Sequence, residues 1–187
     1  MTILETYKSF DKTTTSRYTF KSAGGTIQEI ATGMDKLKKE LFDAPQSIQN
    51  MLYKAILRTV RYAQKDFTPS RSGTWYRYKD EFEEKGTDFG PHLEHVIPFN
   101  EGMNRYLSGD IPAEHLLYLP TALIHLVDSY KFKGTSWETK ATWEYPFKRY
   151  LEVGITKDII SCRGDKINMN KWTIEDHFNL VGYSDEV

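Results

Sequence analysis

Histidines and a neighbouring acid gather in one short stretch of this sequence. Four of the five histidines lie within 34 consecutive residues, from His92 to His125, and Glu94 stands directly before His95. A carboxylate gives a divalent metal ion a hard oxygen ligand, and an imidazole titrates near neutrality and accepts a proton from water. With a second histidine downstream as a further ligand, this set matches the needs of metal-assisted phosphodiester hydrolysis.

The elements that must position these residues follow from local patterns. Residues 92–98 alternate as a short strand that ends at a proline. Residues 99–112 contain two glycines and are expected to form a loop. The mostly apolar residues 113–128 predict a short buried strand that leads into a helix. Pro120 suits the first turn of that helix, which places His125 inside it.

Residues Glu94-His95-Val96-Ile97-Pro98 resemble the acid–His–aliphatic–aliphatic–Pro signature of the HNH nucleases, the ββα-metal finger family. Residues 115–125 resemble the second half of that motif, where an Asn or His opens a short strand and the following helix carries the final His or Asn. The resemblance covers about residues 90–130. It implies an α+β fold with a ββα-metal core at residues 88–132, in which a hairpin and a helix hold one divalent metal ion.

The resemblance also implies a role for each matching residue. His95 is the expected general base, and Glu94 and His125 are the expected metal ligands. His115 fills the middle position, which orients the hairpin and His95, so His95 and His115 are the predicted catalytic residues. A carboxylate with an imidazole suits one Mg²⁺ or Mn²⁺ that keeps several waters. Few protein ligands leave positions open for a phosphate oxygen and the leaving 3′ oxygen.

The sequence departs from the family pattern at several positions. Glu94 replaces the usual Asp, His115 replaces the commoner Asn, and the spacing to His125 is about one residue longer than usual. The paired cysteines that bind structural zinc in many members are absent. If the register is shifted by one turn, Asp128 takes the metal in place of His125. His92 is a metal ligand, a phosphate contact or a residue without a role.

Positive charge is concentrated upstream of the histidines. The formal net charge of the chain is -1, yet residues 45–79 hold seven basic residues against one acid. Apolar residues recur at helical spacing over residues 45–66, and four basic residues of this helix share one stripe. The loop that follows interleaves aromatic residues with arginines, as nucleic-acid-binding loops do. The predicted nucleic-acid-binding residues are Lys54, Arg58, Arg61, Lys65, Arg71, Trp75 and Arg77.

Each of these two features also has a purely structural interpretation. The stripe equally suits a plain solvated helix face, and Trp75 equally suits packing within a hairpin. Elsewhere, Thr32 or Asp35 is expected to cap a helix that runs to about Asp43. A turn is expected at residues 163–165 and a short helix from Thr173 to Leu180, and His177 is given no role.

The chain is interpreted as a single domain of 187 residues. A mostly helical N-terminal region (1–87) carries the basic stripe, and an aromatic-rich C-terminal extension (133–187) follows the 88–132 core. The single cysteine, Cys162, excludes an internal disulfide. No apolar run approaches the ~20 residues of a membrane span, and the start of the chain does not resemble a secretory signal. These features predict a cytoplasmic protein.

The expected function is a metal-dependent DNA endonuclease that uses His95 as general base. Near-neutral charge with one concentrated basic region favours site-specific, restriction-type cutting of double-stranded DNA. A homodimer is expected, because a palindromic site mirrors a two-fold protein. The alternative is a noncatalytic nucleic-acid-binding or phage accessory protein in which the histidines only pack.

Overall fold

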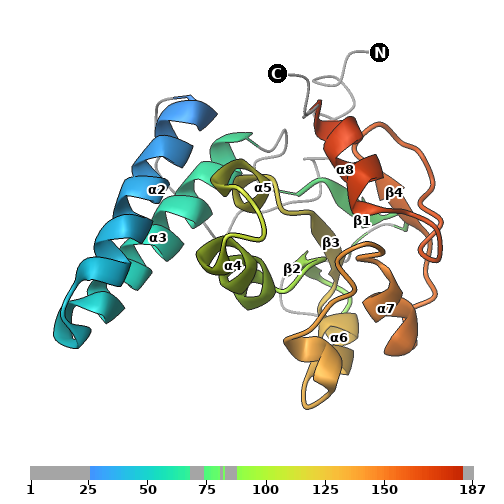
Figure 1. Ribbon diagram of the computed structural model, residues 1–187. Coiled ribbons are helices and arrows are strands. Elements are labelled where there is room, and N and C mark those ends of the chain that lie inside the picture. The colour runs from blue at the N-terminus through green and yellow to red at the C-terminus, as the bar shows by residue number, and fades with distance from the viewer. Residues whose placement is uncertain (1–25, 68–73, 81, 83–87, 183–187) are drawn as a thin grey trace.

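The computed structural model describes residues 26–67, 74–80, 82 and 88–182 and shows a mixed α+β fold (Figure 1). Its α-helices are α2 (Ile27–Asp43), α3 (Gln46–Phe67), α4 (Phe99–Ser108), α5 (Ala113–Leu117), α6 (Leu126–Ser129), α7 (Lys148–Glu152) and α8 (Ile174–Val181). Its strands are β1 (Tyr76–Tyr78), β2 (Pro91–His95), β3 (Thr121–His125) and β4 (Ile159–Ser161). Two short 3-10 helices, η2 (Tyr130–Phe132) and η3 (Ser136–Glu138), connect α6 to α7.

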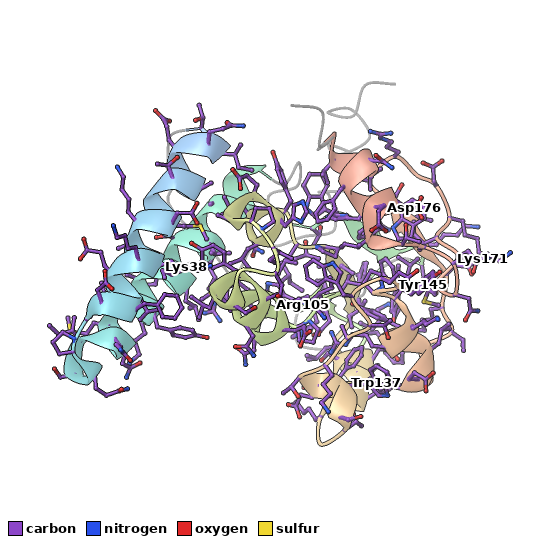
Figure 2. All side chains as sticks on the ribbon, in the orientation of Figure 1. Lys38, Arg105, Trp137, Tyr145, Lys171 and Asp176 are labelled. Atoms are coloured by element: carbon purple, nitrogen blue, oxygen red, sulfur yellow. The ribbon has the colours of Figure 1, made fainter. Side chains whose placement is uncertain are left out.

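Helices α2 and α3 lie side by side along one side of the molecule (Figure 1). The predicted helix at 45–66 is confirmed as α3, but α2 begins earlier than expected. Its N-cap is Thr26, whose hydroxyl accepts from the backbone N–H of Glu29, while the Glu29 carboxylate accepts from the Thr26 N–H. This reciprocal pair satisfies two free donors of the first turn. Lys38 of α2 donates to the Tyr106 carbonyl of α4, which links the α2–α3 pair to α4. Figure 2 labels Lys38 on α2 and Arg105 on α4.

The sheet joins all three predicted regions of the chain. Its four strands lie in the order β2-β3-β1-β4. Strands β2 and β3 are antiparallel, β3 and β1 are parallel, and β1 and β4 are antiparallel. All five residues of β3 are buried, as expected of a strand with neighbours on both sides.

The prediction of a loop at 99–112 is wrong, because residues 99–108 form α4. The two glycines that suggested a loop have different tasks. Gly102 faces α5, and a Cβ there would come within 2.5 Å of a Leu119 methyl group, so glycine lets the two segments pack closely. Gly109 ends α4 in the left-handed conformation at φ 90°.

The predicted order of strand and helix over 113–128 is also wrong. The first part forms the short helix α5, so His115 lies in a helix and does not open a strand. Pro120 precedes β3 and does not start a helix, and His125 is the last residue of β3 and not a helical residue. A proline has no N–H for a central strand, so β3 begins directly after it. The mostly apolar run over residues 113–128 is compatible with a buried strand and with a buried helix, so its pattern alone does not distinguish them.

Two hydrophobic clusters fill the interior, and α8 contributes to both. One lies between the α2–α3 pair and α4, α5 and α8, and the other lies between the sheet and the C-terminal segments. The predicted C-terminal helix is confirmed as α8, with Thr173 as N-cap. Gly164, at φ 88°, forms the expected turn before it. Within the described ranges, no helix has both the length and the apolarity to cross a membrane.

Candidate active site

Strand β2 presents three of the predicted residues on its two faces. Side chains alternate along a strand, so His92 and Glu94 share one face and His95 points to the other. The Nε2 of His92 lies 3.6 Å from Oε2 of Glu94. Both side chains reach solvent, with 37% of His92 and 19% of Glu94 exposed. The pair therefore offers one imidazole nitrogen and one carboxylate oxygen at an accessible edge of the sheet.

The other Glu94 oxygen is held by a buried arginine. Arg149 of α7 is 1% exposed, and its Nη1 lies 3.1 Å from Oε1 of Glu94. The same Nη1 donates to the carbonyl of His95 at 2.6 Å. Arg149 was not among the predicted site residues, because nothing in the local sequence distinguishes it from a surface arginine.

His95 lies at the end of β2, beside aromatic and basic side chains. Its ring contacts the ring of Phe99 with centroids 5.6 Å apart, and the guanidinium carbon of Arg61 lies 5.9 Å from the same Phe99 ring. Burial lowers the pKa of His95 to about 4, and while Glu94 opposes this shift, Arg61 and Arg149 add to it. The imidazole is therefore neutral at pH 7.

The other end of the hairpin holds a second cluster around His125. In the β2–β3 register His95 pairs with Thr121, whereas His125 pairs with Pro91. Four residues of strand separate these two pairs, which is ~13 Å along the sheet. Glu94 pairs with Ala122, three residues before His125, and points to the opposite face. The predicted metal pair, Glu94 and His125, is therefore not brought together.

The contacts of His125 are with groups other than Glu94. The ammonium of Lys157 lies 2.6 Å from its Nδ1, and rings of Tyr78, Phe82 and Phe89 surround it at centroid distances of 5.0, 5.0 and 5.6 Å. Because an ammonium only donates, Nδ1 is the acceptor in this contact.

Asp128, the alternative metal ligand, belongs to the same second cluster. Its carboxylate accepts from the Tyr78 hydroxyl at 2.9 Å and pairs with Lys131 at 2.8 Å and Lys157 at 3.6 Å. Burial on its own raises the pKa of Asp128, but hydrogen bonds from Lys131 and Tyr78 and the lysine charges lower it below its ordinary value. This carboxylate is paired with two lysines and only 5% exposed, so it offers a ligand less access than Glu94 does.

Neither His115 nor Trp75 lies beside His95. The His115 ring stacks on Phe178 of α8 with centroids 4.2 Å apart. Trp75, predicted to stack on bases, is only 4% exposed and packs edge-on against Tyr118 and His177. Its structural interpretation is therefore the right one.

The basic stripe is exposed where the structure describes it. Lys54, Arg58 and Arg61 are all exposed on α3. Arg77 is in β1, where its Nε donates to the Tyr78 carbonyl at 2.8 Å. Arg71 and the side chain of Lys65 lie outside the described residues.

His177, for which no role was predicted, is the centre of a buried polar chain. Its Nε2 lies 2.6 Å from the Tyr118 carbonyl and its Nδ1 lies 2.8 Å from the Tyr76 hydroxyl. Trp172 Nε1 donates to that hydroxyl at 3.1 Å. Burial lowers the pKa of His177 to about 4, so a neutral ring links these groups.

The two ends of the β2–β3 strand pair differ in how well their side chains could bind a metal ion. Among the described residues, no three His, Cys, Asp or Glu side chains form a metal-binding group. His92 and Glu94 nevertheless form an accessible pair, whose carboxylate oxygen suits an Mn²⁺ or Mg²⁺ ion that retains most of its waters. We find no matching protein-family profile, no similar curated protein and no similar solved structure.

Proposed function

We propose that the protein is a metal-dependent endonuclease whose active site is the end of β2. The observation that carries this proposal is the position of the His95 imidazole, which lies against the Phe99 ring that Arg61 also contacts. A base and a cation near one another match the two needs of phosphodiester hydrolysis. The base removes a proton from water, and the cation attracts the phosphate.

The proposed roles follow from the side chains at this end. His95 accepts the proton of the attacking water, and Arg61 binds a nonbridging phosphate oxygen. On the face of β2 opposite to His95, His92 and Glu94 would hold the Mg²⁺ or Mn²⁺ through Nε2 and Oε2, which lie 3.6 Å apart. When bound, such an ion stabilises the charge that develops on the phosphate and the leaving 3′ oxygen. His92 thus replaces His125 in the proposed ligand set.

The exposed stripe of α3 supports a nucleic-acid substrate. Lys54, Arg58 and Arg61 lie on one exposed stripe that ends beside His95. From Lys54 to Arg61 the helix rises ~10 Å, which is about three phosphates of one DNA strand. The stripe therefore suits a backbone that runs along α3 and delivers one phosphate to His95.

More specifically, we propose that a dimer of this protein cuts double-stranded DNA at specific sites. It follows from the localisation of the basic residues and from the two-fold symmetry of palindromic sites. The alternative is a nucleic-acid-binding protein without catalysis, in which Arg61 and the stripe bind phosphates and His95 only packs. The exposed stripe supports both, and the position of His95 near Arg61, where the stripe ends, favours the enzyme.

The test is incubation of the protein with plasmid DNA and Mg²⁺ or Mn²⁺, beside EDTA and His95→Gln. Lys166→Ala is the control, because this exposed lysine pairs only with Asp158 among the contacts described, far from the site in sequence. We expect metal-dependent cleavage by the parent and by the control, and none by His95→Gln. Discrete fragments would support the restriction-type proposal, and a smear would remove it. Intact plasmid under both metals, with DNA binding retained, would favour the noncatalytic alternative.

A further inference from the structure

Arg149 is the most deeply buried charged side chain at the proposed site. Its guanidinium is 1% exposed, and buried charges are stable only when they are paired and hydrogen-bonded. The pairing is extensive. Nη1 meets Glu94 and the carbonyls of His95 and Val96, at 3.1, 2.6 and 3.5 Å.

The opposite side of the guanidinium is fixed as well. Nε and Nη2 both donate to the Trp137 carbonyl, at 3.0 and 2.7 Å. Trp137, labelled in Figure 2, lies on the segment between α6 and α7. The guanidinium carbon lies 4.1 Å from the centre of the Phe132 ring. Arg149 therefore joins two segments of the chain at the point where β2 ends.

This arrangement has a specific effect on Glu94. Oε1 is occupied by Arg149, so Oε2 is the oxygen turned toward His92. A carboxylate fixed in this way binds a metal ion through one oxygen. Ca²⁺ favours many oxygen ligands and bidentate carboxylates, whereas Mg²⁺ accepts single carboxylate oxygens and retains its waters. The position of the guanidinium thus bears on which metal the pair accepts.

We infer that Arg149 is a positioning residue that restricts Glu94 to one open oxygen and fixes the backbone of His95, so that the site selects Mg²⁺ or Mn²⁺ over Ca²⁺. This inference rests on the proposed function for its role in catalysis. Its structural part concerns metal binding and is measurable without any cleavage. If the hydrogen bonds of Arg149 only stabilised the fold, substitution of Arg149 would leave metal selectivity unchanged in the folded protein.

The first experiment compares the parent with Arg149→Lys, with Lys148→Met as control. Lysine keeps the charge, but one ammonium cannot span Glu94 and the Trp137 carbonyl as the planar fork does. Lys148 is next in sequence, and its ammonium lies over the Tyr145 ring, 4.2 Å from its centre. Mn²⁺ binding is followed by electron paramagnetic resonance, with Ca²⁺ and Mg²⁺ as competitors.

We expect Mg²⁺ to displace Mn²⁺ from the parent and from Lys148→Met at concentrations at least 10-fold lower than Ca²⁺ requires. In Arg149→Lys we expect this preference to shrink at least threefold and kcat to fall about 10-fold, with KM within twofold. A folded Arg149→Lys protein with the parent's preference and kcat would overturn the inference. If the parent binds Mn²⁺ with this preference but cleaves no nucleic acid, the proposed function fails and the metal inference stands.

A second measurement needs no variant and covers the case in which Arg149→Lys does not fold. In the parent, nuclear magnetic resonance follows the Arg149 Nε–H and the His92 ring during a Mg²⁺ titration. We expect the His92 resonances to shift while the Arg149 Nε–H stays protected and unchanged. Loss of the Arg149 signal on Mg²⁺ binding, or an unchanged His92 ring at saturating Mg²⁺, would overturn the inference.

Discussion

The two ends of the β2–β3 pair carry the same residue types in different surroundings. At the β2 end, His95 lies near Arg61, and the His92–Glu94 pair on the opposite face reaches solvent. At the β3 end, the side chains of His125 and Asp128 are each 5% exposed. There the carboxylate is balanced by two lysines and a tyrosine hydroxyl. The β2 end thus has accessible polar side chains, whereas the polar side chains of the β3 end are buried against one another.

This difference shows that an acid and a histidine together do not define a site. Both ends contain that combination, but their cations differ in placement. At the β3 end Lys157 contacts both His125 and Asp128, so the positive charge is used internally. At the β2 end Arg149 holds only one Glu94 oxygen, and Arg61 is exposed on α3. The accessible carboxylate of Glu94, against the buried carboxylate of Asp128, is what distinguishes the two ends.

The largest expected effect is that of His95→Gln on cleavage. Loss of a general base typically costs 10²- to 10⁴-fold in rate, and glutamine keeps the approximate size of the side chain. We expect a fall of at least ~100-fold in kcat with DNA affinity within about threefold. Initial cleavage rates and fluorescence anisotropy measure the two quantities. If the rate is unchanged in the folded variant, the β2 end is not the catalytic centre.

The matching substitution at the β3 end, Asp128→Asn, is expected to affect stability. It removes the charge that balances Lys131 and Lys157 and weakens the acceptor of the Tyr78 hydroxyl. We expect the free energy of unfolding to fall by about 2–3 kcal/mol, measured by urea denaturation, with kcat of the folded protein within twofold. Asp158→Asn is the control, because Asp158 forms an exposed ion pair and surface pairs contribute about 0–1 kcal/mol. Equal losses of unfolding free energy in Asp128→Asn and Asp158→Asn would contradict the expectation that the buried carboxylate contributes more to stability than the exposed one.

The pH dependence of stability separates the two ends further. His95 has a pKa of about 4 in the folded protein against 6.5 when unfolded, so the unfolded chain binds more protons between these values. The contribution of the neutral His95 to the free energy of unfolding is therefore fully present above pH 6.5 and is lost as the pH falls to about 4. His177, with the same pKa, adds to this loss. The pKa of Asp128 is below 3.8, so its loss begins only at lower pH.

We expect a decrease of the order of 4 kcal/mol in unfolding free energy from pH 6.5 to 4.5, about 2 kcal/mol from each of the two imidazoles. Urea midpoints across this range measure it, and His95→Gln is expected to reduce the slope without abolishing it, since His177 remains. A flat profile down to pH 4.5 would show that neither imidazole is held neutral by burial.

The smallest expected effect distinguishes neighbouring residues of the basic stripe. Arg61→Ala is expected to lower kcat/KM about 10-fold, because Arg61 lies beside His95 as well as in the stripe. Arg58→Ala, one turn away, is expected to cost no more than about threefold and to lower the slope of log affinity against log salt by about one. Equal effects of both would make the stripe a phosphate-binding surface with no special role for Arg61.

Elements with local signals could be predicted from the sequence. Helix α3 follows from its apolar spacing, α8 lies within one residue of its expected range, and β2 was expected, although it ends at His95, three residues before Pro98. Glu94 and His95 were recognisable as candidate residues for the same reason, since the two residues are adjacent. Local signals failed at α4, where Gly102 serves close packing and does not break the helix.

Contacts between residues far apart in the sequence could be identified from the tertiary structure alone. The β2–β3 register places His125 ~13 Å of strand away from His95, and no local pattern specifies which residues of two strands pair. Arg149 lies 55 residues from Glu94 in sequence, and its burial depends on the packing of α7 against the end of β2. A long-range contact depends on the whole arrangement of strands and helices, whereas helix and strand signals repeat within a few residues. For that reason the sequence supplied the residues of the candidate site, and the fold determined their partners.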